Sequence, residues 1–185
     1  MVRTLFLGIR IEERVNKTLD RHIRAWDEKN ITWTKRELRH MTLLFLGRVE
    51  DQYLPEVCSA IAEACYDKAP FEVMMNEIKI GPDKDHPKAI WLSGDIHEEL
   101  HNLYTDLSQK LFSFAQIQKK QFRPHITLGR IQQSGLSFEE EDWVQTVPVQ
   151  IPISVEEVTL FESVREKGEL VHNLVDACEL QKEEE

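Results

Sequence analysis

Two short stretches of the sequence, His40-Met41-Thr42-Leu43 and His125-Ile126-Thr127-Leu128, share one pattern: a histidine, an apolar residue, a threonine and a leucine. Each lies in an apolar, strand-like segment, and each is followed by a Gly-Arg pair, Gly47-Arg48 and Gly129-Arg130. Side chains alternate between the two faces of a strand, so each histidine shares a face with the threonine two positions later. We therefore expect two strands with an apolar back, each presenting an imidazole and a hydroxyl at the front.

The doubled pattern supplies the groups needed to hydrolyse a phosphodiester without a metal. One imidazole can accept a proton, the other can donate one, and two hydroxyls can donate hydrogen bonds to phosphoryl oxygens. A single H-x-T is weak, because a strand can carry His and Thr on its solvent face for no catalytic reason. Two copies that also share the apolar second residue and the leucine are much harder to attribute to chance.

The chain outside the motifs alternates between strand-like and helix-like segments. The strand-like segments are 3–9, 38–47, 71–80, 89–92, 126–131, 149–161 and 170–180, and the helix-like ones are 11–26, 51–67 and 95–111. This alternation predicts an α+β fold with antiparallel sheets, in two similar halves that each hold one motif. We expect one bilobal domain over residues 1–180, with two sheets flanked by helices and both motifs at a central cleft. Residues 181–185 are expected to form a disordered acidic tail.

The distribution of charge points to a small anionic ligand. The net charge of −10 argues against a long nucleic-acid groove or an anionic membrane surface as the main partner. Residues 35–48 and 119–130, which bracket the motifs, nevertheless carry eight basic residues and one acidic residue. Ordinary solubilising charge is the alternative, but this clustering favours a local site for one or a few phosphates.

The cysteines and the N-terminal segment indicate the cellular compartment of the protein. The number of cysteines is odd and no two form a C-x-x-C pair; they are Cys58, Cys65 and Cys178. A reduced, cytoplasmic setting fits them best. The first residues lack the architecture of a signal peptide, and no apolar run reaches transmembrane length. We therefore expect no membrane partner.

Four stretches carry a resemblance to a known family. They are Arg3–Ile9, Leu38–Gly47, Phe122–Arg130 and Val158–Ser163. They resemble the 2H phosphoesterases, which are defined by two H-x-T-x motifs, and are most similar to the LigT-like RNA 2',3'-cyclic phosphodiesterases, also named 2'-5' RNA ligases. The family fold is a bilobal α+β duplication, in agreement with the expectation above. One departure lies near His172, where relatives often have tyrosine, and we assign His172 no role.

The resemblance implies metal-independent hydrolysis of 2',3'-cyclic phosphate ends of short RNA to 2'-phosphomonoesters, with 2'-5' ligation as the reverse reaction. It implies His40 as proton donor and His125 as proton acceptor, although the residues alone do not decide which is which. Thr42 and Thr127 would bind the phosphoryl oxygens. Arg130 is a candidate phosphate clamp because a guanidinium binds bidentately, yet strict alternation places it on the face away from His125. No cofactor or metal is implied, and we expect a monomer.

Further basic and aromatic residues could contact RNA beyond the reacting phosphate. The basic candidates are Lys35, Arg36, Arg39 and Arg123. Phe122 or Trp33 could stack on a base, although core packing is the simpler role for either.

Three rival interpretations stay open. His97-Glu98-Glu99-Leu100-His101 matches the H-E-x-x-H zinc pattern, although surface histidines on a charged helix explain it more simply. A non-catalytic RNA-end or nucleotide-binding module would keep the basic segments without needing two histidines. The same chemistry could also act on 2'-5' oligonucleotides or on a cyclic phosphate of ADP-ribose.

Overall fold

The computed structural model describes residues 1–24, 31–82, 87–114, 122–132 and 146–181. The strands in these ranges are β1 (Val2–Arg10), β2 (Ile31–Trp33), β3 (His40–Glu50), β4 (Phe71–Pro82), β5 (Pro87–Gly94), β6 (His125–Ile131), β7 (Val147–Val155), β8 (Glu157–Glu166) and β9 (Glu169–Glu179). The helices are α1 (Glu13–Ile23), α2 (Leu54–Cys65) and α3 (Glu98–Lys110), with short 3-10 helices η1 (Arg36–Leu38) and η2 (Asp51–Tyr53). Of the tail expected at 181–185, only Gln181 lies within the described residues.

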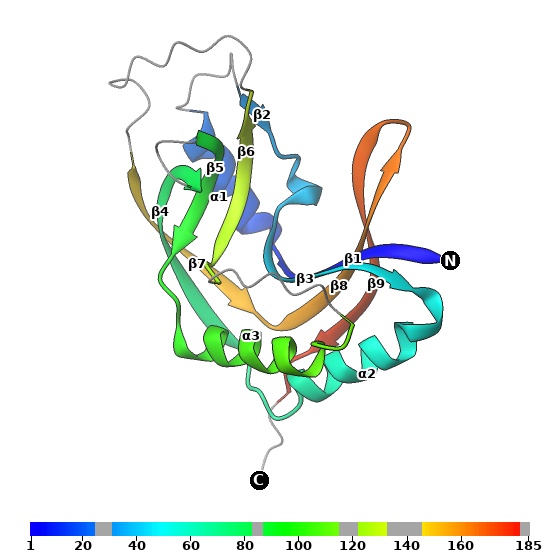
Figure 1. Cartoon of the computed structure of the whole chain (residues 1–185). Helices are drawn as coiled ribbons and strands as arrows, with labels where there is room; N and C mark the ends of the chain where they lie inside the picture. Colours follow the sequence, from blue (N-terminus) through cyan, green and yellow to red (C-terminus); the bar gives the residue numbers. More distant parts are fainter. Residues whose placement is uncertain (25–30, 83–86, 115–121, 133–145, 182–185) are drawn as a thin grey trace.

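The strands form a single antiparallel sheet in the order β7-β4-β5-β6-β3-β1-β8-β9, with β2 paired to β6 (Figure 1). The two motif strands, β3 and β6, are neighbours at the centre of this order. In the described part of the chain they are joined by one residue pair, Met41 with Ile126. The α+β class and the antiparallel pairing are confirmed. The two expected sheets are corrected to one, because this pair connects the β6 half to the β3 half.

Each helix buries one apolar stripe against the rest of the core. The stripes follow helical spacing and consist of Val15, Leu19 and Ile23 in α1, Val57, Ile61 and Ala64 in α2, and Leu100, Leu103 and Leu107 in α3. Helices α2 and α3 lie side by side under the sheet (Figure 1). Within the described ranges, no helix has the length and apolar character required to cross a membrane.

The segment expected as one strand over 149–161 is two strands. β7 pairs with β4, whereas β8 pairs with β1 and β9 in the other half of the sheet. The chain therefore leaves one half and enters the other at Glu156, whose carbonyl accepts a hydrogen bond from the Leu180 amide at 2.7 Å. Continuous apolar alternation concealed this break, because Val155 and Val158 on either side are both buried.

Candidate active site

His40 and His125 are held by the same local hydrogen bond. The Nδ1 atom of His40 lies 2.8 Å from the Leu38 carbonyl oxygen, and that of His125 lies 2.8 Å from the Arg123 carbonyl oxygen. A carbonyl can only accept, so Nδ1 carries the proton in both rings. Each neutral imidazole therefore keeps Nε2 as a free proton acceptor, and each becomes a proton donor at Nε2 when it is charged.

The register between the motif strands gathers the four motif side chains on one face. Met41 and Ile126 pair across the junction and are fully buried, which fixes the core face of both strands. Residues 40 and 42 of β3 and residues 125 and 127 of β6 therefore lie on the opposite face. The four motif side chains thus share one face at the only residue pair that joins the two strands in the described part of the chain.

Aromatic side chains surround His40. Its ring centroid lies 4.8 Å from that of Phe6, 5.2 Å from that of His172 and 5.9 Å from that of Phe161. This burial lowers the pKa of His40 to about 4 against the opposing hydrogen bond to the Leu38 carbonyl, and the nearby imidazoles of His172 and His125 lower it further. His40 in the free protein is therefore neutral at pH 7.

His125 packs against one large aromatic side chain. The Trp91 ring of β5 lies 4.1 Å from the His125 ring, between centroids. Gly81 of β4 makes room for this indole, since a Cβ there would come within 2.3 Å of Trp91 Cδ2. Burial lowers the pKa of His125, against the hydrogen bond to the Arg123 carbonyl. A neutral His125 at pH 7 suits a proton acceptor.

A β-bulge changes the side on which Arg130 lies. In the β5–β6 pairing, Ile90 faces Gly129 but the next residue, Trp91, faces Thr127, so Leu128 is an extra residue in β6. Beyond this bulge, Gly129 and Ile131 are buried and Arg130 is exposed. The alternation is shifted by one, which places Arg130 on the face of His125 and Thr127. The bulge removes the objection from strict alternation, and the phosphate-binding role of Arg130 stays a prediction.

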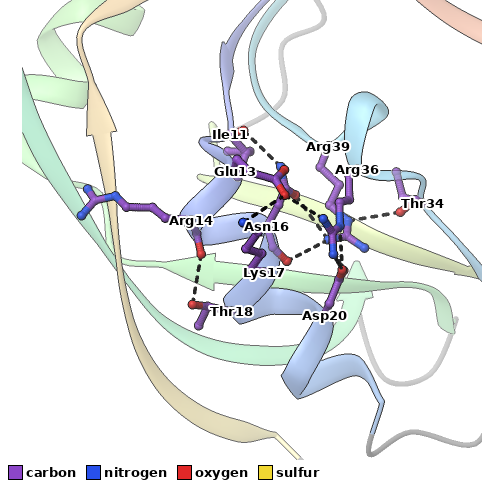
Figure 2. Close-up of polar contacts among 10 residues, drawn as sticks. All are labelled: Ile11, Glu13, Arg14, Asn16, Lys17, Thr18, Asp20, Thr34, Arg36 and Arg39. Atoms are coloured by element: carbon purple, nitrogen blue, oxygen red, sulfur yellow. Dashed lines mark hydrogen bonds and ion pairs between the residues drawn. The ribbon is translucent and has the colours of Figure 1, made fainter.

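Several of the basic residues near the first motif are engaged in structural ion pairs (Figure 2). Arg39 is buried and donates to the Asp20 carboxylate at 2.7 Å, to Asn16 Oδ1 at 3.3 Å and to the Thr34 carbonyl at 3.1 Å. Arg36 also binds Asp20, with Nε donating at 2.7 Å. These contacts fasten η1 and the start of β3 to α1, and an RNA contact of Arg36 or Arg39 stays a prediction.

The remaining basic residues near the motifs divide into paired and unpaired groups. Lys35 binds Glu169 of β9 at 2.7 Å, so it too is engaged within the protein. Among the described residues, the side chains of Arg123 and Arg130 form neither an ion pair nor a hydrogen bond. Lys119 and Lys120 lie outside the described residues. Arg48 likewise forms neither an ion pair nor a hydrogen bond among the described residues, but it faces Thr4 at the far end of β3. The anion site expected from the charge cluster stays a prediction, and Arg123 and Arg130 are the unpaired cations nearest the second motif.

The H-E-x-x-H stretch has no zinc-binding geometry. His97 precedes α3 as its N-cap residue, so the two histidines do not share one helical face as the pattern requires. The His97 Nε2 atom accepts a 3.4 Å hydrogen bond from the Met74 amide instead. In the ranges that the structure describes, no three His, Cys, Asp or Glu side chains cluster in a way that could hold a metal ion.

The match to known sequences covers both motifs. Residues 15–167, most of the chain, match the sequence model of one family, described as the 2'-5' RNA ligase superfamily. The chain belongs to this superfamily. The resemblance drawn from the two H-x-T-L motifs is thereby confirmed.

Individual members of the 2'-5' RNA ligase superfamily are similar over most of their length. A protein of Thermotoga maritima named RNA 2',3'-cyclic phosphodiesterase is 29% identical over 132 residues, covering 68% of each chain. One of Methanocaldococcus jannaschii with the same name is 24% identical and covers 69% of this chain and 70% of its own. The fold resembles that of TT0787 of Thermus thermophilus, with a TM-score of 0.85, 21% identity and coverage of 98% and 100%. It also resembles apo LigT of Escherichia coli, with a TM-score of 0.79, 17% identity and coverage of 96% and 97%.

Sequence reasoning did not place four ring neighbours of the two histidines in the site. They are Phe6, Trp91, Phe161 and His172. They come from β1, β5, β8 and β9, and none lies in a motif. Their placement depends on strand register, which no local pattern in the sequence records.

Proposed function

We propose that this protein is a metal-independent RNA 2',3'-cyclic phosphodiesterase that opens the cyclic phosphate to a 2'-phosphomonoester. The observation that carries the proposal is the matched hydrogen bonding of His40 and His125, which leaves two Nε2 atoms for proton transfer on adjacent strands. The names of the Thermotoga and Methanocaldococcus relatives support the choice of substrate.

The proposed reaction divides the protons between the two rings. His125 removes a proton from the attacking water, and His40, once protonated, gives a proton to the departing 3' oxygen. Thr42, Thr127 and Arg130 bind the phosphoryl oxygens, where negative charge accumulates in the transition state. In ligation an RNA 5' hydroxyl takes the place of the water, forms the new bond to phosphorus and expels the same 3' oxygen, so the same groups serve both reactions.

Because the pKa of His40 is low, His40 must gain its proton when the substrate binds. The anionic phosphate, bound beside His40, favours the charged imidazole and raises its pKa. Substrate binding therefore favours protonation of His40, and this proton is the one that passes to the leaving 3' oxygen. His125 lies on the other motif strand and stays neutral while His40 is charged, because two adjacent imidazolium ions repel each other.

The setting of the enzyme is part of the proposal. The three cysteines are free thiols, which supports a reducing cytoplasm as the site of action. We further propose that one chain suffices for activity, since both motifs come from the same sheet.

The test is hydrolysis of a short RNA ending in a 2',3'-cyclic phosphate with EDTA present, followed by phosphorus NMR of the product. His40→Ala and His125→Ala should each reduce kcat/KM by about a hundredfold or more. His97→Ala is the matched control and should retain wild-type activity. No turnover by the wild type would indicate a binding module, and full activity in either motif variant would contradict the two-histidine assignment. Activity that EDTA abolishes would indicate a metal enzyme.

A further inference from the structure

The His125 imidazole lies against the Trp91 indole. The centroids of the two rings are 4.1 Å apart and their planes differ by 30°, so the contact is closer to a stack than to an edge-on contact. The face of an indole carries the negative part of its quadrupole and attracts a cation within about 6 Å of the ring centroid. A proton that arrives on His125 therefore places its positive charge within reach of this face.

The sheet holds the indole in place from the other side. β5, which carries Trp91, lies between β4 and β6, the strand of His125. On β4, a Cβ at Gly81 would come within 2.3 Å of Trp91 Cδ2 and within 2.4 Å of Cε3. Only a residue without a side chain leaves this space to the indole, which is therefore confined between Gly81 and the imidazole.

His125 has no carboxylate partner within the described residues. Its Nδ1 donates to the Arg123 carbonyl oxygen at 2.8 Å, whereas in the Ser-His-Asp triad a carboxylate accepts this hydrogen bond. On β4, two strands from β6, Glu77 and Lys79 bind each other. Their opposite charges leave no net negative charge to stabilise an imidazolium at His125.

The other charged groups near His125 are cationic. Arg130 lies on the same face of β6, and Arg123 precedes this strand. On β3, the His40 imidazole repels His125 when both rings are charged. Within the described part of the protein, an imidazolium at His125 is therefore stabilised by the Arg123 carbonyl and by the indole face.

We propose that Trp91 is a positioning residue of the reaction: its indole face stabilises the imidazolium that forms as His125 takes the proton of the attacking water. The inference rests on the proposed function. In that step the water O–H bond breaks, its proton joins Nε2 of His125, and the water oxygen forms the new bond to phosphorus. Nδ1 keeps its proton, so the ring becomes positive while it lies on the indole.

The direction of the effect follows from two influences on His125. Burial lowers its pKa and so makes it a weaker base. Attraction between the imidazolium and the indole favours the charged form and offsets part of this loss. Weakening the indole face should therefore lower the pKa of His125 further and slow the removal of a proton from water.

The experiment weakens the indole face while keeping its shape. Fluorine withdraws electrons from the ring, so the protein is produced with tryptophan, 5-fluorotryptophan or 5,6-difluorotryptophan. NMR titration of labelled histidines gives the pKa of His125, whose signal is the one missing from His125→Ala. This pKa should fall with each fluorine, by about 0.5 unit for two. At pH 7, kcat/KM for cytidine 2',3'-cyclic phosphate should fall about twofold.

Trp91→Phe is the matched control, because it has no tryptophan at this position while the other tryptophans still carry the fluorines. Its His125 pKa should be the same in all three preparations. Three results would overturn the proposal: a wild-type pKa that fluorination leaves unchanged, an equal shift in Trp91→Phe, or a lower pKa with constant kcat/KM. If no preparation hydrolyses the substrate, the proposed function fails, and the titration decides by itself whether the indole stabilises a charged His125.

Discussion

The Arg39 guanidinium donates a 2.7 Å hydrogen bond to Asp20, and the Arg39 side chain is 4% exposed. Arg36 binds the same carboxylate from a position that is 42% exposed. Burial alone would raise the pKa of Asp20, but hydrogen bonds from these two arginines outweigh it and hold the pKa below its usual value. One carboxylate thus fastens the residue before His40 to α1 through a buried and an exposed partner.

This pairing predicts unequal losses of stability from two similar variants. Arg39→Met leaves Asn16 and Asp20 without their buried cation, and the free energy of unfolding should fall by about 3 kcal/mol. Arg36→Met removes a solvent-screened partner and should cost less than about 1 kcal/mol. Urea unfolding followed by circular dichroism measures both. Equal losses would show that the buried position of Arg39 adds nothing.

The two histidines predict a pH–rate profile displaced to the acid side. The reaction requires a charged His40 and a neutral His125, and burial lowers both pKa values below 6.5, that of His40 to about 4. The kcat/KM for a cyclic phosphate should therefore peak below about pH 6.5 and fall about tenfold per pH unit above it. Because bound phosphate raises the pKa of His40, kcat should persist to higher pH than kcat/KM. A kcat/KM maximum well above neutrality would contradict the assignment.

The same burial makes His40 a source of acid sensitivity. Between pH 6.5 and about 4, the unfolded chain binds a proton at His40 that the folded protein does not. Stability should therefore fall as the pH falls through this window and level off below it, a loss on the order of 3 kcal/mol. His40→Phe removes this contribution, so its free energy of unfolding should change less between pH 7 and 4.5. Denaturant titrations at both pH values test this, and an unchanged pH dependence would count against it.

The bulge in β6 predicts a specific role for Arg130. Arg130 follows Thr127 by three positions along the strand, about 10 Å, a span that a phosphate held by Thr127 and an extended Arg130 can bridge. Arg130→Ala should lower kcat/KM for cyclic phosphates by roughly tenfold to a hundredfold. Arg130→Lys should restore only part of it, because lysine cannot bind bidentately. Arg48→Ala, the corresponding arginine after the first motif, faces Thr4 at the far end of β3 and should have no effect.

Gly8 sets the position of His40. A Cβ at Gly8 would lie 2.9 Å from the Met41 carbonyl oxygen and 3.4 Å from His40 Cδ2. Gly8→Ala should therefore shift the imidazole and lower kcat by roughly tenfold. Steady-state kinetics with melting curves as a control separates this shift from unfolding. An unchanged kcat would mean that the strand absorbs the methyl group without moving the ring.

The sequence was sufficient for the parts of this molecule that depend on local pattern. The motif strands, the three helices and the shared face of each His and Thr follow from periodicity alone. The side occupied by Arg130 did not, since one extra residue in β6 reverses the alternation and nothing in the letters marks it. The aromatic surroundings of His40 were equally hidden, because Phe6 and Phe161 come from strands far apart in the chain. The basic residues before the first motif suggested free cations for an anion. Their acidic partner on α1 can be identified only once the fold is known.

The junction at Met41 and Ile126 has a consequence for how such a protein can diversify. The positions of the two reacting rings depend on a backbone register and on bonds to carbonyls two residues away, all contained in two short strands. Connections elsewhere can lengthen, shorten or change composition without altering the distance between these rings. Evolution can therefore alter which molecules are selected while the proton-transfer chemistry stays constant.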